Sequence, residues 1–409
     1  MSAVRTGICL LVAFAVLAHG GVEPWSEGVL EVGAAVLLLI WAVKTASDPE
    51  LTLVWSPLLW PLLAVWVIGA VQSLPGMSMV PFLTRIELLK YTALVALFFL
   101  CLQSYRTRAQ WRGFVWFLLM LGFAVSLFAI LQHFTFNGKL YWVREMRYGG
   151  TPFGPYVNRN HFAGLMELLI PPGVAIQVMG GERRDQMPLL ALFTVLPIGA
   201  LFLSASRGGI MSFVAEMAFL AILVILRRRE RKALVAAVLV VGFAVMLVSW
   251  LGIGAAMERF ESYKGLEVSE GRRVGMLHGT MHIFLDHPVL GTGLGTLQQV
   301  YPRYETVYDG LVVNHAHNDY AEALAETGAI GGICFGLFLV ALFWNGWKIL
   351  TADTDGRNLA YHAGALIACL GLLVHAFVDF NFHIPSNALL FLLQAALATS
   401  VLPLSERGR

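Results

Sequence analysis

The feature that most limits the fold is a series of apolar runs, each long enough for a membrane helix, that recur along the 409 residues of the chain. A helix rises about 1.5 Å per residue, so about 20 apolar residues cross about 30 Å of hydrocarbon. With 58% hydrophobic and only 13% charged residues, the chain is too apolar for a soluble enzyme. The runs predict an all-α fold, a polytopic membrane protein with about 12 transmembrane helices.

The basic residues predict how these helices are oriented. Basic residues in short loops stay in the cytoplasm. Placing both termini there collects 16 of the 28 Lys and Arg residues in short cytoplasmic segments. Two longer loops, about 134–159 and about 255–318, then face outward. We therefore expect a single membrane domain over residues 1–409, with the 255–318 loop capping the outer face.

Histidine and cysteine add to this expectation. Ten of the eleven histidines fall at or beyond the outer helix ends, which favours a functional outer face over a general preference of histidine for interfaces. The four cysteines lie inside apolar runs and predict no disulfide or metal site. The net charge of +2 gives no reason to expect nucleic acid as a partner.

Several short motifs place arginine at the predicted outer helix ends. Arg207 lies in a Ser-Ala-Ser-Arg-Gly-Gly turn, which favours an anion-binding guanidinium over a snorkelling side chain. Arg159 and Asn160 begin the sixth helix, where Asn160 is either a plain N-cap or part of a site. Arg272 and Arg273 precede an amphipathic stretch.

That amphipathic stretch carries His278 and His282 at i,i+4 spacing, which zinc sites use. A solvated helix face is the better interpretation, because no Glu or Cys follows at ligand spacing.

The richest polar motif is Asn314-His315-Ala316-His317-Asn318-Asp319-Tyr320, which enters a helix with Glu322 and Glu326. A histidine near carboxylates can act as a general base near neutral pH, although the same residues could form only a polar helix cap. Asp379 belongs to a second cluster, between the last two helices, that either extends this site or caps it.

These motifs together resemble the superfamily of O-antigen ligases and O-antigen polymerases of the bacterial envelope. The most specific match is His317-Asn318, nine residues, Gly328, two residues, Gly331; the Arg207 turn and the segment from Gly271 to Gly295 also match. The resemblance implies that His317 is catalytic and that Arg207 and Arg272 contact a pyrophosphate, with Arg273 as a competing candidate. Arg159 would add a phosphate contact outside the family pattern. Supporting roles fall to His315, Asn318, Asn160, Glu322 and Asp379.

The resemblance also implies a reaction. The expected activity moves a glycan from undecaprenyl pyrophosphate to an acceptor hydroxyl, on lipid A core or a growing polysaccharide, at the periplasmic face of the bacterial inner membrane. We expect inversion at the sugar, no cofactor and no metal, with arginines balancing the leaving-group charge. One alternative is an O-antigen or exopolysaccharide polymerase of the same superfamily. Another is a solute or bicarbonate transporter, although only Glu216 stands out as polar within a span.

Overall fold

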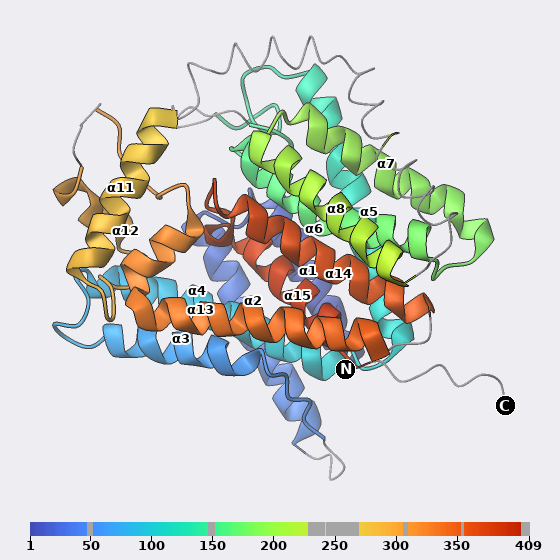
Figure 1. The fold of residues 1–409 in the computed structure, drawn as a ribbon, viewed down its shortest axis with the longest axis horizontal. Coiled ribbons are helices and arrows are strands. Elements are labelled where there is room, and N and C mark those ends of the chain that lie inside the picture. The colour runs from blue at the N-terminus through green and yellow to red at the C-terminus, as the bar shows by residue number, and fades with distance from the viewer. Residues whose placement is uncertain are drawn as a thin grey trace.

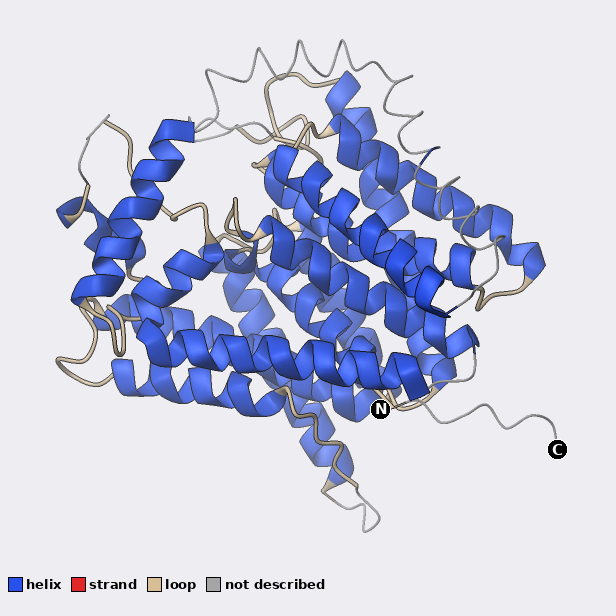
Figure 2. Cartoon of the chain, in the orientation of Figure 1, coloured by secondary structure: helices blue, strands red, loops and turns tan. Residues whose placement is uncertain are grey.

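The computed structural model describes residues 1–46, 52–145, 152–227, 242, 270–305, 310–352 and 356–401. These residues form α-helices and short 3₁₀ turns, with no β-strand among them (Figure 2). The expectation of an all-α fold is therefore confirmed for the described part of the chain.

Most of the predicted spans correspond to helices. Eight helical segments are long and apolar enough to cross a membrane: α2 (Pro24–Thr45), α4 (Pro81–Ser104), α5 (Arg108–Phe134), α6 (Arg159–Met179), η1 (Arg184–Gln186) with α7 (Met187–Leu203), α8 (Arg207–Arg227), α13 (Asp319–Ala352) and α14 (Gly356–His375). Three further apolar helices are shorter: α1 (Ser2–Leu17), α3 (Leu59–Gln72) and α15 (Pro385–Thr399). The sequence also predicts a span at about 233–254, which lies outside the described residues except for residue 242. The chain is thus a multi-pass helical protein, and the count of about 12 stays a prediction.

Helices α6 and α14 form the centre of the bundle, and both are buried along nearly their whole length. Their backbones approach closely because Gly364 of α14 faces Pro172 of α6, where a Cβ would lie 2.5 Å from the proline Cα. Small residues commonly permit such contacts between membrane helices. Helices α3 and α13 lie along one side of this centre, and α5, α7 and α8 lie along the other (Figure 1).

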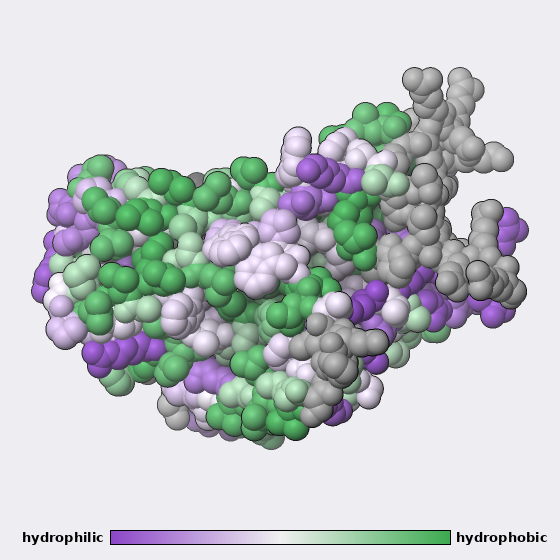
Figure 3. All heavy atoms as spheres, turned by 90° about the horizontal axis from the view of Figure 1, so that it is seen from below, coloured by the Kyte–Doolittle hydropathy of each residue, from purple (hydrophilic) through white to green (hydrophobic). Residues whose placement is uncertain are grey.

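The outer surface of the bundle is apolar. Large side chains of α2, α3 and α13 are exposed, including Val32, Leu39, Trp60, Ile333, Val340 and Trp344. Apolar residues cover much of the face that lies along the lower edge of Figure 1 and is turned to the viewer in Figure 3. A surface of this kind suits contact with lipid acyl chains.

The polar turns gather at two separate ends of the bundle. At the histidine end, the turns at residues 18–23, 152–158 and 376–384 meet; for example, Ser386 N–H donates to Gly20 O at 2.9 Å. Helices α11 (Glu270–Asp286) and α12 (Leu297–Val300), with the 3₁₀ turn η3 (Tyr301–Arg303), lie beyond this end (Figure 1). The expected long loop is therefore partly helical. At the opposite end, called here the arginine end, the turns at residues 104–108 and 180–186 carry Arg106, Arg108, Arg183 and Arg184.

A kink in α13 explains one glycine of the sequence motif. Gly328 has φ of 65° inside the helix, a conformation that glycine adopts without strain. A Cβ there would collide with the backbone of Val289. The freed N–H of Ala329 instead donates to Pro288 O at 2.8 Å. The kink thus fixes the Asp286-His287-Pro288 segment against the start of α13.

Candidate active site

The start of α13 is clamped to the end of α14, and this clamp holds His317. The Asn318 side chain accepts from Ala321 N–H at 2.9 Å and donates to Phe377 O at 3.0 Å. Asp319 N–H donates to Ala376 O at 2.9 Å. His317 itself has φ of 50°, a left-handed conformation that is strained for a non-glycine residue and persists only where neighbouring contacts enforce it.

The His317 imidazole faces a buried carboxylate. Its Nδ1 lies 3.4 Å from Oδ1 of Asp379, whose side chain is 1% exposed. His161 Nε2 approaches the same oxygen at 3.8 Å. Burial by itself would raise the pKa of Asp379, but hydrogen bonding and positive charge from His161 and His317 hold that pKa well below its usual range.

This pairing suits His317 to proton transfer. A proton on Nδ1, facing the Asp379 carboxylate, leaves Nε2 as the acceptor nitrogen. The carboxylate then stabilises the imidazolium that forms when Nε2 takes up a proton. The Phe380 ring packs edge-on against His317, at 4.9 Å between centroids, and restricts its rotation.

The His317 side chain lines a cavity of about 410 Å³ together with two arginines, Arg207 and Arg273. Asn160 and Asn318 line the same cavity. Arg207 is the first residue of α8, where the Ser206 hydroxyl accepts from Gly209 N–H at 3.2 Å as a cap. The positive end of the helix dipole and two guanidinium groups favour a polyanion here.

Gly208 has a packing role in this wall. A Cβ at Gly208 would lie 2.5 Å from Nε2 of His375, which is buried at the end of α14. The His375 Nδ1 in turn pairs with Glu167 of α6 at 2.7 Å. The glycine after Arg207 therefore allows α8 to approach α14 at the edge of the cavity.

The structure separates the candidate arginines. Arg273 lines the cavity and donates to Val378 O at 3.4 Å, whereas Arg272 does not line it and donates to Leu311 O at 3.2 Å. Arg159 is 2% exposed and is also absent from the cavity wall. The cap of α6 is Asn158, whose side chain accepts from Asn160 N–H at 2.9 Å, so Asn160 is not the N-cap.

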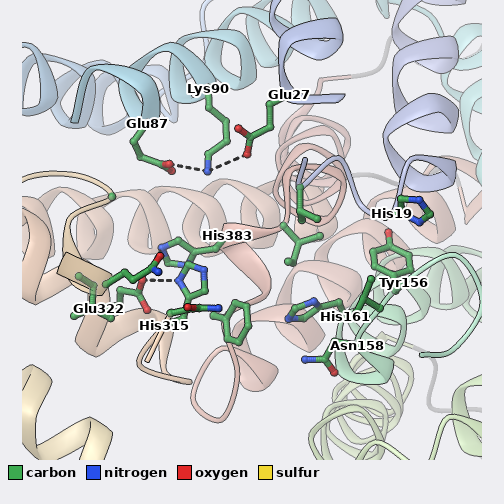
Figure 4. A pocket seen from close by; sticks show the side chains of 18 of the residues that line it. His19, Glu27, Glu87, Lys90, Tyr156, Asn158, His161, His315, Glu322 and His383 are labelled. Atoms are coloured by element: carbon green, nitrogen blue, oxygen red, sulfur yellow. Dashed lines mark hydrogen bonds and ion pairs between the residues drawn. The ribbon is translucent and has the colours of Figure 1, made fainter. Parts of the chain in front are cut away.

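The other two sequence candidates, His315 and Glu322, line a second cavity of about 380 Å³ (Figure 4). His315 Nδ1 lies 2.8 Å from Oε1 of Glu322, and His383 Nε2 lies 3.2 Å from the same oxygen. The Phe380 ring stacks on His315 at 4.3 Å and also contacts His317. Phe380 therefore stands between the two groups of histidines.

Sequence reasoning missed three charged residues of the second cavity. Lys90 of α4 lies 2.7 Å from Glu87 and 3.9 Å from Glu27 of α2 (Figure 4). These residues sit inside apolar runs near the outer helix ends, and that unusual placement was the only available signal. His161 was also unassigned, although it neighbours Asn160.

Comparison with known proteins finds a family model that matches part of the chain. Residues 192–336 match the family model described as O-antigen ligase. This match covers less than half of the chain and supports membership of the O-antigen ligase superfamily. A search of curated proteins finds no significant match.

The O-antigen ligase match covers one part of the site. It includes Arg207, Arg273 and His317, while Asn160 and Asp379 lie outside it. Members of the family are glycosyltransferase-like ligases or polymerases. The match therefore does not by itself assign a role to any residue.

Proposed function

We propose that this protein is an O-antigen ligase-like glycosyltransferase that moves a glycan from undecaprenyl pyrophosphate to an acceptor hydroxyl. The observation that carries this proposal is one cavity lined by Arg207, Arg273 and His317 at the ends of apolar helices. This cavity brings together cationic groups that can bind a pyrophosphate and a base that can accept the proton of a hydroxyl. A lipid-linked donor needs its site near a membrane boundary, because its tail stays in the hydrocarbon.

The reaction assigned to this cavity is a single displacement. The acceptor oxygen attacks C1 of the sugar, and the bond from C1 to the phosphate oxygen breaks with its electron pair on the pyrophosphate. His317 Nε2 takes the acceptor proton, and Asp379 stabilises the resulting imidazolium. Attack opposite the leaving group inverts the anomeric centre.

Arginine, and no metal ion, balances the leaving-group charge in this proposal. A guanidinium donates two parallel hydrogen bonds to phosphate oxygens, and it does so most strongly when partly desolvated. Arg273 is preferred over Arg272 because only Arg273 lines the cavity. Arg159 does not line this cavity, so it is not given a phosphate contact in this proposal. The supporting groups are Asn160 and Asn318.

The proposed setting is the bacterial inner membrane, with both termini cytoplasmic and the histidine end facing the periplasm. The arginines in the short turns at the opposite end, Arg106, Arg108, Arg183 and Arg184, support this orientation. The partners are then the lipid-linked donor, a lipid A core or glycan acceptor, and the bilayer itself.

Two alternatives remain distinguishable by experiment. A polymerase of the same superfamily would use the same cavity with a lipid-linked glycan as acceptor. A transporter would need polar groups within the spans, and Glu216 of α8 is the observation in its favour, since both carboxylate oxygens are buried without a hydrogen bond.

The test is transfer by purified protein in liposomes that contain an undecaprenyl-pyrophosphate-linked glycan. One arm supplies lipid A core as acceptor, and the other supplies only further lipid-linked glycan. We expect glycan on lipid A core; growth of the lipid-linked glycan instead would indicate a polymerase. Absence of transfer in both arms, with solute or bicarbonate uptake by the same vesicles, would overturn the proposal.

A further inference from the structure

Three potential metal ligands from separate segments meet on the wall of the second cavity. His315 precedes α13, Glu322 lies in its first turn, and His383 lies in the 3₁₀ turn η4 (Asn381–His383) (Figure 4). One ring nitrogen from each histidine and one carboxylate oxygen of Glu322 all lie within 4.8 Å of one another. Among the described residues, this is the one group of three or more such side chains with that spacing.

The spacing of these atoms fits a tetrahedral ion. Zinc binds imidazole nitrogen and carboxylate oxygen at about 2.0–2.1 Å, which places neighbouring ligand atoms about 3.3 Å apart. His383 Nε2 and Glu322 Oε1 are 3.2 Å apart, and His315 Nδ1 and the same oxygen are 2.8 Å apart. These two separations lie within about 0.5 Å of the tetrahedral value, and the two imidazole ligand atoms lie within 4.8 Å of each other.

Each ligand is also oriented by a second contact. His383 Nδ1 lies 2.9 Å from Asp319 Oδ1, an arrangement in which a carboxylate fixes a metal-bound imidazole. The other oxygen of Glu322 accepts from Ala316 N–H at 2.8 Å. The His315 ring stacks on Phe380. Zinc sites commonly hold their ligands through outer contacts of this kind.

The charge around the three ligands favours a cation. Glu27, Glu87 and Glu326 line the same cavity as Glu322, and Lys90 is the basic residue that faces them. Glu326 also accepts from Gly295 N–H at 2.9 Å and from Leu297 N–H at 3.0 Å. The carboxylates outnumber the fixed positive charges, so a divalent ion would lower their mutual repulsion.

We propose that His315, Glu322 and His383 bind one divalent transition-metal ion, with zinc as the expected species. Imidazole nitrogen with carboxylate is a donor set that zinc accepts, and the fourth position faces the cavity. The ion ties the loop before α13 to η4, and thereby steadies the segment that carries His317. None of its ligands lines the arginine cavity, so this site is separate from the proposed donor site and does not rest on the transfer reaction.

The competing occupant is a proton. A doubly protonated His383 would donate from Nδ1 to Asp319 and from Nε2 to Glu322, and would satisfy the same contacts without a metal. The two arrangements differ in what the purified protein binds, so a direct measurement of metal separates them.

The experiment uses the full-length protein in detergent, stripped with EDTA and then dialysed against Zn²⁺ or Co²⁺. Bound zinc is measured by elemental analysis, and Co²⁺ is followed by the visible absorption that tetrahedral coordination produces. We expect one equivalent per chain, with the signal lost in His315→Ala and in His383→Ala. Asp319→Asn should weaken binding about 10- to 100-fold, as loss of an outer ligand partner does.

The control is the double variant His278→Ala/His282→Ala. These two exposed histidines of α11 lie 4.7 Å apart between ring centroids and could hold an adventitious ion. The proposal requires full binding in this variant. It is overturned if the stripped wild type takes up no stoichiometric metal, or if His315→Ala and Glu322→Gln, both checked for monodisperse folded protein, bind as the wild type does.

Discussion

The two ends of the helix bundle each bury a carboxylate, but the hydrogen bonds to that carboxylate differ between the ends. At the arginine end, Glu182 accepts from Arg112 Nε at 2.7 Å, from Trp116 Nε1 at 3.0 Å and from Tyr361 Oη at 2.6 Å. Burial would raise the pKa of Glu182, yet these hydrogen bonds lower it. Each of these hydrogen bonds to Glu182 is 3.0 Å or shorter.

At the histidine end, the contacts of Asp379 with other side chains are longer. Its Oδ1 accepts from Phe380 N–H at 2.9 Å, but it faces His317 at 3.4 Å and His161 at 3.8 Å, and its Oδ2 is buried without a hydrogen bond. The Nε of Arg273 is likewise buried without one. Buried polar groups are normally satisfied, and catalytic hydrogen bonds often tighten only when substrate binds. The difference indicates that the first cluster stabilises the fold and that the second is arranged for a ligand.

The largest expected effect that tests this comparison is at His317. His317→Ala should lower the rate of glycan transfer by about 10²–10⁴-fold, the contribution of a general base. Its thermal midpoint in detergent should match the wild type, because the ring packs at a cavity wall. His315→Ala, across Phe380, should affect transfer less. Transfer by His317→Ala at nearly the wild-type rate would remove the catalytic assignment.

The arginines should show the next largest effect. Arg207→Lys and Arg273→Lys should each slow transfer by about 10²–10³-fold, since an ammonium group keeps the charge but loses the planar fork. Arg272→Lys is the matched control and should transfer at close to the wild-type rate. The assay is initial rate in liposomes at saturating donor. A larger loss at Arg272 than at Arg273 would contradict the placement of these side chains.

The smallest and most discriminating effect comes from one matched pair, Asp379→Asn and Glu182→Gln. Asp379→Asn loses a hydrogen bond to a charged group, about 1.5–3 kcal/mol, or about 10- to 100-fold in transfer. Glu182→Gln should leave transfer within about twofold while lowering the free energy of unfolding by about 1–3 kcal/mol. If Glu182→Gln slowed transfer as much as Asp379→Asn, the two ends would not differ in function.

The same pair has a pH signature in thermal unfolding. Because the folded pKa of Asp379 is depressed, its ionised form contributes stability above the unfolded pKa of about 3.9. That contribution is lost as pH falls through the lower folded pKa. The stability gap between wild type and Asp379→Asn should therefore narrow as pH falls below about 4.

Much of the site could be expected from local sequence. The His317-Asn318 motif, the Arg207 turn and Gly328 are each short patterns whose geometry depends on neighbouring residues. The cap made by Asn318 and the kink at Gly328 follow from local backbone chemistry. The choice between Arg272 and Arg273 could not be made in this way, because it depends on which side of α11 faces the turn that follows α14.

The sequence by itself determined that the chain is a helical membrane protein with its histidines at one end, because apolar length and charge position act residue by residue along the chain. Only the tertiary structure decided that Asp379 faces His317, that Arg273 lines the same cavity as Arg207, and that Phe380 contacts both His315 and His317. Those contacts join segments far apart in the chain, and their geometry follows from how α6, α8, α13 and α14 pack. Packing of that kind leaves no periodic signal in the sequence, since small shifts of a helix change which side chain reaches the cavity.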